Sequence, residues 1–211
     1  AEAAVASGVM TTSIGAADPS AMTSGDAAFV LRSAKNTDGN GLQSMSDWNE
    51  FRMRATMASV LNGFQDPRLP TYFLPTYNSG TQYKGLRNGL SVDQLSETPN
   101  LAANNSHVGQ RWSSTAVVDK NNNILGSPTS IATAQNVMVT AESYFLRAEG
   151  ALLGWNMGGT PQQMYEAGIT NSLAQWGITN PTVVQNYINS TNTPAPPGDA
   201  LNSPAVSTVP V

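Results

Sequence analysis

The sequence contains no cysteine, which excludes disulfide bonds, zinc–thiolate sites and thiol catalysis. Charged residues are also scarce, because Asp, Glu, Lys and Arg make up only 11% of the 211 residues, against about a quarter in typical domains. The net charge is −4, and the basic residues are scattered, with Arg52 and Arg54 as the only pair two positions apart. Nucleic-acid binding is therefore not expected, since neutralising phosphates requires clustered cations.

Long apolar runs are missing as well. No run of about 18 apolar residues occurs, so no membrane-spanning helix is expected. The opening AEAAVASG lacks the basic and apolar segments of a signal peptide, and we expect a mature product or a fragment. The single histidine, His107, lies in a polar segment without a G-x-S-x-G motif, so we expect a solvated side chain and no Ser-His-Asp triad.

Aromatic and uncharged polar residues are abundant by comparison. Four Trp, six Tyr and five Phe argue against disorder, which usually combines high net charge with few aromatics. A folded chain of this composition has a large, neutral surface rich in hydrogen-bonding groups. Such a surface suits a neutral polar ligand.

The segment 139–177 has the strongest helical pattern. Apolar residues recur three and four positions apart from about Val139, and Gly154 with the pair Gly158-Gly159 ends this first helix. We expect its apolar stripe to face the core. The stripe consists of Ala141, Tyr144, Phe145, Ala148, Leu152 and Trp155.

A second helix follows in the same segment. Thr160 is its predicted N-cap, Pro161 its first residue and Gln163 the partner of Thr160 in a capping box. Gly168 would let another backbone come close, and Gly177 ends the helix. Its stripe, also predicted to lie in the core, consists of Tyr165, Ile169, Leu173 and Trp176. Together the two helices predict an αα-hairpin.

Weaker patterns precede this hairpin. They predict a helix in 1–14, a strand in 26–33 and a strand followed by a helix in 45–63. The apolar residues of 45–63 also have helical spacing throughout. We favour a strand to about residue 54 that packs Phe51 and Met53 inward. Thr56 would then cap a helix that ends at Asn62-Gly63.

Other regions are predicted to be irregular. Residues 66–77 contain three prolines and should lack regular helix. Residues 91–136 are polar, with no predicted element. Asn180-Pro181 opens a third helix that runs to about Asn189, and 190–211, with five prolines, should form an extended tail.

Two polar motifs are interpreted as structural. Residues 119–123, DKNNN, open like a calcium loop, but Ile124 stands where that loop needs Gly and Ser130 where it needs Glu. We therefore predict an Asn-rich turn. In the motif 66–68, DPR, the proline fixes a turn, and the two charged residues are expected to pair with each other or with a helix end.

Two separated motifs resemble the SusD/RagB family of Bacteroidetes surface lipoproteins. The first is AESYFLRAEGALLGWNMGGTPQQMYEAGITNSLAQWGI, residues 141–178. The second lies upstream and consists of Asp66-Pro67-Arg68-Leu69, Tyr72-Phe73 and Tyr83-Lys84-Gly85. The matched region spans residues 56–190.

The resemblance implies a mainly α-helical fold. A tetratricopeptide-like αα-hairpin scaffold would carry long irregular loops and a few short strands. Residues 1–211 would form a single, incomplete SusD-like domain, because family members are considerably longer than this chain. The resemblance also implies a protein that is not an enzyme. No cofactor and no metal-ligating residue is predicted, and whether loop oxygens bind a metal ion stays open.

The function implied is nutrient capture at the cell surface. The protein would bind an oligosaccharide or other nutrient and deliver it to a SusC-type TonB-dependent transporter, held at the outer membrane by a lipid anchor that this chain lacks. Two alternatives stay open. One is a helical-repeat protein-interaction module without glycan binding. The other is a glycan-active hydrolase with paired carboxylates.

Loop aromatics are the candidate glycan contacts. Flat aromatic faces pack against sugar C–H groups, while amides and charged side chains bind hydroxyls. Trp112, with His107 and Arg111 nearby in sequence, is the strongest candidate, although packing of Trp112 onto the scaffold is an equally good interpretation. The other candidates are Tyr72, Tyr77 and Tyr83.

Overall fold

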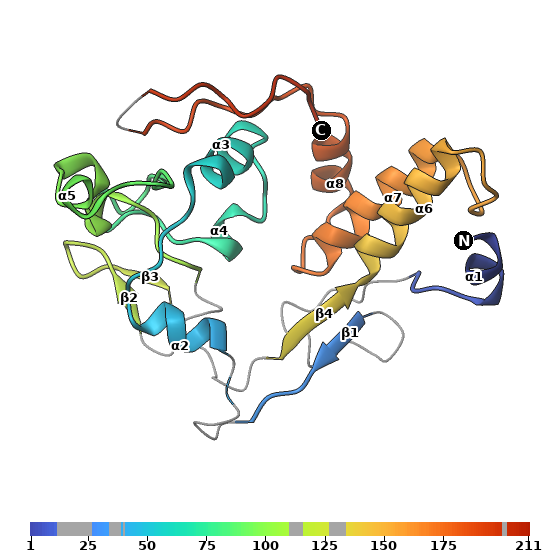
Figure 1. The fold of residues 1–211 in the computed structure, drawn as a ribbon, viewed down its shortest axis with the longest axis horizontal. Helices are drawn as coiled ribbons and strands as arrows, with labels where there is room; N and C mark the ends of the chain where they lie inside the picture. Colours follow the sequence, from blue (N-terminus) through green and yellow to red (C-terminus); the bar gives the residue numbers. More distant parts are fainter. Residues whose placement is uncertain (12–26, 34–38, 40, 110–115, 127–133, 200–201) are drawn as a thin grey trace. The chain divides into compact units, whose positions relative to one another are not determined.

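The computed structural model describes residues 1–11, 27–33, 39, 41–109, 116–126, 134–199 and 202–211 (Figure 1). The chain forms two compact units. The first contains Ala1–Arg32 and Thr133–Ile188, and the second contains Ser33–Ala132 and Asn189–Val211. The secondary structure is mainly helical with a few short strands, which confirms the predicted fold class. No helix in these described ranges is long and apolar enough to cross a membrane.

Two helices, α6 (Thr140–Leu152) and α7 (Pro161–Ala174), pack against each other in the first unit and form the predicted αα-hairpin (Figure 1). Ala148 of α6 is buried, as are Ile169 and Leu173 of α7. The apolar stripes predicted from sequence therefore meet in the middle of the hairpin.

The ends of α7 match the sequence prediction. The Thr160 hydroxyl accepts from the Gln163 N–H at 3.2 Å, and the Gln163 side chain accepts from the Thr160 N–H at 3.0 Å. Gly177 has a φ of 78°, which glycine adopts without steric cost. The N–H of Ile178 then donates to the Leu173 carbonyl at 3.1 Å, completing a Schellman motif.

Two predictions about α6 were wrong. Trp155 is 48% exposed and Leu152 is 75% exposed, so the predicted stripe does not continue to the end of the helix. The reason is Met157, which is 3% exposed and takes the inward position beside Gly150. Two residues of the second stripe also differ from the prediction, because Trp176 is half-buried and Tyr165 is 46% exposed.

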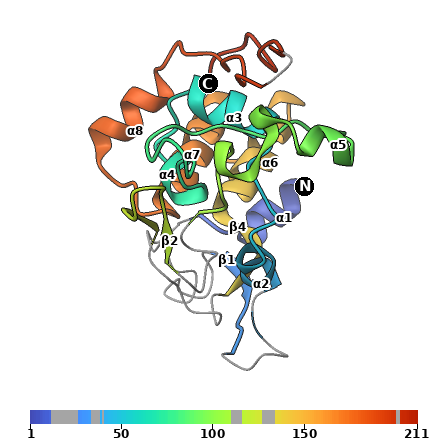
Figure 2. The same cartoon turned by 90° about the vertical axis from the view of Figure 1, so that its left-hand side faces the viewer.

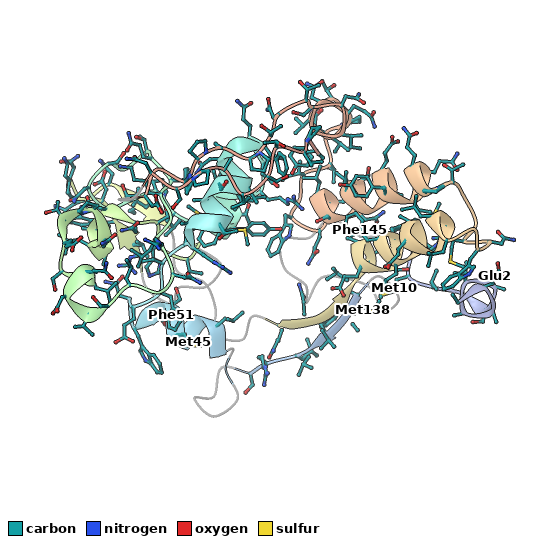
Figure 3. All side chains as sticks on the ribbon, turned by 45° about the horizontal axis from the view of Figure 1, so that its top comes forward. Glu2, Met10, Met45, Phe51, Met138 and Phe145 are labelled. Carbon is teal, nitrogen blue, oxygen red and sulfur yellow. The ribbon has the colours of Figure 1, made fainter. Side chains whose placement is uncertain are left out.

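Gly168 makes room for a side chain and not for a backbone. A Cβ at this position would lie 2.5 Å from the ring of Phe145, so the expected backbone approach was wrong. Phe145, which is labelled in Figure 3, also packs against Tyr165, and the two ring centroids are 5.7 Å apart. Its ring is 37% exposed and lies at the edge of the hairpin, not inside it.

A two-stranded antiparallel sheet completes the first unit together with two further helices. Strand β1 (Ala27–Val30) confirms the strand predicted in 26–33, and it pairs with β4 (Gln135–Val139). Helix α8 (Pro181–Ile188) confirms the third predicted helix. Helix α1 (Glu2–Ser7) is shorter than the predicted 1–14.

The second unit is built from short elements joined by loops, most of them visible in Figure 2. Its short strands, β2 (Val117–Val118) and β3 (Ile124–Gly126), pair with each other in an antiparallel hairpin. Several elements lie within 91–136, so the expectation of no regular structure there was wrong. In order, the elements are α2 (Gly41–Asp47), α3 (Ala55–Gly63), α4 (Leu69–Tyr72), α5 (Val92–Leu95), the 3₁₀ helices η2 (Thr98–Asn100) and η3 (Ala102–Asn104), β2 (Val117–Val118) and β3 (Ile124–Gly126).

The region 45–63 differs in part from its prediction. Its first residues belong to helix α2, and residues 51–54 are extended but form only isolated bridges, such as the pair Arg52 and His107. Met53 is fully buried as expected, whereas Phe51 is 40% exposed and lies with Met45 along an apolar surface pocket (Figure 3). The N-cap of α3 is Arg54, not Thr56.

The chain between 66 and 77 is turning, with one short helical turn at α4 that the three prolines did not prevent. Pro70 stands at the start of this turn, where the missing N–H leaves no bond unmade. The Arg68 side chain donates to the Asp66 carboxylate, with Nε to Oδ1 at 2.9 Å. This ion pair confirms the structural interpretation of the motif at 66–68.

The Pro-rich tail is extended, as predicted, and it is fixed to α3. The Ala195 N–H donates to the Ser59 carbonyl at 2.9 Å, and the Ser59 hydroxyl donates back to the Ala195 carbonyl. Gly63 allows the close approach, because a Cβ there would lie 2.2 Å from the Ala195 nitrogen. The tail is therefore part of the packed second unit.

Candidate functional site

One cavity of the second unit has a volume of about 470 Å³, which is within the range of small-ligand sites. Its walls come from four separate stretches of the chain between residues 49 and 125. Its lining residues are Asn49, Arg52, Pro75, Tyr77, Ala102, Ala103, Asn105, His107, Ala116, Val117, Val118 and Leu125. We call it the Tyr77 cavity.

An extended segment, residues 106–109, is hydrogen-bonded to two other stretches of the chain that form walls of this cavity. The Met53 N–H donates to the Ser106 carbonyl at 2.8 Å, and the Leu74 N–H donates to the His107 carbonyl at 2.9 Å. The segment thus runs between the chain at 53 and the chain at 74. These backbone bonds bring Arg52, His107 and Pro75 to one place although they are far apart in sequence.

Arg52 supplies the positive charge of the cavity. Its Nε donates to the Ala102 carbonyl at 3.0 Å, and its terminal nitrogens donate to the Asn49 and Phe51 carbonyls and to the Asn49 side-chain oxygen. A guanidinium has five N–H groups, so one of them has no partner in the described part of the chain. Burial lowers the pKa of Arg52, and the bonds to neutral oxygens hold the side chain in one orientation.

His107 lies in the cavity wall and is not solvated, which corrects the sequence expectation. It is 8% exposed, with Nδ1 2.8 Å from the Val108 carbonyl and Nε2 3.2 Å from the Ser46 carbonyl. Burial lowers the pKa of His107, and the charge of nearby Arg52 lowers it further against the opposing effect of the backbone carbonyls. The imidazole therefore serves as a neutral part of the wall.

Tyr77 is the aromatic face of the cavity, and its side chain is 46% exposed. The Lys120 N–H donates to the Tyr77 carbonyl at 3.0 Å, which fixes the residue to the turn between β2 and β3. In that turn the Asp119 carboxylate accepts from the Asn121 and Asn123 backbone and from the Asn123 side chain at 2.8–2.9 Å. The bond from the Asn123 side chain is the main cause of the lowered pKa of Asp119. The predicted Asn-rich turn is thereby confirmed, and it supports the cavity.

The other sequence candidates are distributed differently. Tyr72 and Tyr83 pack against the core formed by Met53, Ala58, Leu61 and Leu69 and do not line the Tyr77 cavity. Trp112 and Arg111 lie outside the described residues. The structure therefore brings together two of the six candidates, Tyr77 and His107.

Three further lining residues, Asn49, Arg52 and Asn105, were not among the ligand-binding candidates predicted from the sequence. Asn49 has a φ of 60°, a left-handed conformation that is uncommon outside glycine and that asparagine tolerates best. No sequence motif marks these residues, because their proximity depends on the bridge between residues 52 and 107. Within the described ranges, no cluster of three or more His, Asp or Glu side chains could hold a metal ion.

The chemistry of the Tyr77 cavity is neutral and hydrogen-bonding. Among the lining residues, only Arg52 has a charged side chain at neutral pH, and no Asp or Glu is present in this set. Tyr77, Arg52 and Asn49 line the same space and supply an aromatic ring, a guanidinium group and a side-chain amide. This combination can hold a polar uncharged molecule with one apolar face.

Comparison with known proteins then identifies the family. The family model "SusD-like: Susd and RagB outer membrane lipoprotein" matches residues 1–210. The chain belongs to the SusD-like family. No curated protein matches the chain.

Solved structures of SusD homologues are similar to this SusD-like chain. A chitin-binding SusD homologue from Flavobacterium johnsoniae is 35% identical, with a TM-score of 0.59 over 77% of this chain and 29% of its own. A SusD homologue from Bacteroides ovatus is 27% identical, with a TM-score of 0.66 over 100% of this chain and 38% of its own. Another, from Bacteroides thetaiotaomicron, is 26% identical, with a TM-score of 0.65 over 96% of this chain and 35% of its own. The chain thus spans about a third of the length of these relatives.

Proposed function

We propose that this SusD-like chain binds a carbohydrate in the Tyr77 cavity. The observation that carries the proposal is that the partly exposed Tyr77 lines one cavity together with Arg52 and Asn49, whose side chains are hydrogen-bonded to each other. Sugar rings present C–H faces to aromatics and hydroxyls to amides and guanidinium groups. The cavity offers both kinds of contact without a negative charge among its described lining residues.

The similarity to a chitin-binding protein supports a glycan as ligand. That relative is 35% identical over 77% of this chain. Chitin is a neutral polymer that carries hydroxyl and acetamido groups, which match neutral amides and one N–H donor. Chitin oligosaccharides are therefore the first ligands to test, followed by other neutral oligosaccharides.

Binding is proposed in preference to hydrolysis. Glycoside cleavage usually needs two carboxyl groups about 5–10 Å apart across the scissile bond. The described lining of the Tyr77 cavity supplies Arg52 and His107 but no carboxyl group. The family description, an outer-membrane lipoprotein, is compatible with capture of a ligand at the cell surface.

Delivery to a transporter extends the proposal. The full protein would be anchored by lipid at the outer-membrane surface and pass the bound oligosaccharide to a SusC-type TonB-dependent transporter. Copurification of such a transporter with the full-length protein from bacterial membranes would support this role. Recovery without any transporter, from membranes that contain SusC-type proteins, would count against it.

The binding test uses Tyr77→Ala and a matched control, Tyr165→Ala. Both tyrosines are 46% exposed, and Tyr165 lies on α7 of the other unit. By analogy with base–aromatic stacking, Tyr77→Ala should weaken oligosaccharide binding by about 1–3 kcal/mol, while Tyr165→Ala leaves it unchanged. Calorimetric titration of both variants measures this, and equal affinities would remove Tyr77 from the site.

The remaining sequence candidates are tested in the same way. We propose that Trp112 and Arg111 add a second aromatic and a second cationic contact to the ligand. Trp112→Ala should then also weaken binding by about 1–3 kcal/mol. Tyr72→Phe and Tyr83→Phe keep the core packing of these rings and test only their hydroxyl groups.

A further inference from the structure

A second cavity of the second unit lies beside the Pro-rich tail. It has a volume of about 230 Å³, and its lining includes Lys84, Thr98, Asn100, Asn105 and Asp199. We call it the tail cavity. A more open cavity of about 530 Å³ shares Lys84 and Gly198 with it and adds Tyr83 and two prolines of the tail.

Two asparagines give the tail cavity fixed acceptors. Asn100 is 6% exposed and Asn105 is 4% exposed. Asn100 Nδ2 donates to the Gln94 carbonyl at 2.8 Å, and Asn105 Nδ2 donates to the Leu101 carbonyl at 2.9 Å. These bonds set the orientation of both amides. The two Oδ1 atoms have no hydrogen-bond partner in the described part of the chain and remain as acceptors.

Lys84 gives the tail cavity a hydrogen-bond donor, its ammonium group, on a backbone segment that is itself hydrogen-bonded. Its N–H donates to the Ser106 hydroxyl at 3.0 Å, and its carbonyl accepts from the Ser106 N–H at 2.8 Å. The neighbouring Gly85 packs so closely that a Cβ would lie 2.6 Å from the Arg54 carbonyl oxygen. The backbone at Lys84 is therefore fixed, while its exposed ammonium has no partner among the described residues.

The arrangement selects the class of ligand. The positive charge of Lys84 disfavours a metal ion, and the amide oxygens together with the Asp199 carboxylate disfavour an anion. A ligand with neighbouring hydroxyl groups fits both the asparagine oxygens and the Lys84 ammonium. A hydroxyl group can donate to an Oδ1 atom and can accept from the ammonium. We propose that the tail cavity is a second carbohydrate-binding site of this chain.

The two sites are distinct but share a wall. Asn105 lines both the Tyr77 cavity and the tail cavity. The tail site rests on Lys84, Asn100 and Asn105 and needs neither Tyr77 nor Arg52. The chain is thus expected to hold two short oligosaccharides at once.

Thr98→Tyr and Lys84→Ala test the tail site. Thr98 is exposed and lines the tail cavity, so tyrosine there fills the space without disturbing buried residues. Calorimetric titration with chitotriose, cellotriose, maltotriose and xylotriose gives the number of bound equivalents. We expect about two for the unchanged chain with at least one of these sugars, one for Thr98→Tyr, and about tenfold weaker binding at the tail site for Lys84→Ala. Arg87→Ala is the control, because Arg87 is exposed and lines neither cavity.

The outcomes separate the two sites. One bound equivalent that disappears in Tyr77→Ala would overturn the tail site and leave the Tyr77 site in place. Binding that survives Tyr77→Ala and disappears in Thr98→Tyr would support the tail site and remove Tyr77 from the function. Two equivalents in a folded Thr98→Tyr variant would overturn the tail site, and no binding of any of the four sugars would overturn both.

Discussion

The α6–α7 hairpin and the loops of the second unit are stabilised by different kinds of interaction. The hairpin ends are fixed by bonds between residues three to five positions apart, such as the pair Thr160 and Gln163. The loops are fixed by bonds over long separations, such as Ser59 to Ala195 and Ser106 to Lys84. Both of these serines are fully buried, so short polar side chains replace regular secondary structure in ordering the loops. The comparison shows that hydrogen bonds over long separations can order a loop-built site without regular secondary structure.

The largest expected effect is on the core of the hairpin. Leu173 is fully buried, and Leu173→Ala should lower the free energy of unfolding of the first unit by about 2–5 kcal/mol, from lost burial and the cavity left behind. Leu152→Ala is the matched control, because Leu152 is 75% exposed and its loss should change stability by less than about 0.5 kcal/mol. Urea unfolding of both variants measures the difference. Equal losses would contradict the packing described for the hairpin.

Alanine substitutions at two glycines test how crowded the backbone is in the loops of the second unit and in the hairpin. A Cβ at Gly109 would lie 2.2 Å from the Thr71 carbonyl oxygen, whereas a Cβ at Gly168 would meet the partly exposed ring of Phe145. Gly109→Ala should cost about 1–3 kcal/mol, because backbone must shift. Gly168→Ala should cost less, since the ring can turn and alanine gains about 1 kcal/mol of helix propensity.

Thermal unfolding of both glycine variants, with a binding titration, provides the measurement. Gly109→Ala should also weaken binding at the Tyr77 cavity, because Gly109 continues the segment that carries His107. Gly168→Ala should leave binding unchanged. A stable Gly109→Ala variant with normal affinity would show that the loops are more adaptable than their hydrogen bonds indicate.

The smallest expected change in the free energy of unfolding comes from removing the N-cap side chain of a capping box. Two such boxes can be compared. Thr160 caps α7, which has buried residues, and Ser91 caps the four-residue α5, which has none. Thr160→Ala should lower the free energy of unfolding by about 1 kcal/mol. Ser91→Ala should speed amide exchange at Gln94 only and leave global unfolding unchanged. Denaturant unfolding with hydrogen exchange tests both, and a global loss in Ser91→Ala would mean that α5 belongs to the cooperative core.

Sequence patterns predicted the hairpin well and the site poorly. Three helix ends follow from residues within one turn of each other. They are the capping box at Thr160, the end of α7 at Gly177 and the start of α8 at Pro181. Burial was harder to predict, because Met157 and not Trp155 fills the inward position at the end of α6. Whether an apolar residue at a helix end faces inward depends on the loop that follows, which helical spacing does not describe.

The sequence by itself determined the helices of the hairpin, the family and the extended character of the tail. Capping, propensity and proline geometry act between near neighbours, so they can be recognised along the chain. Only the tertiary structure decided that Arg52 and Tyr77 share one cavity and that Lys84 and Asn100 share another. These groupings depend on backbone bonds between segments far apart in sequence, such as Met53 to Ser106. No local pattern specifies such partners, because each serine or backbone amide could bond to many others.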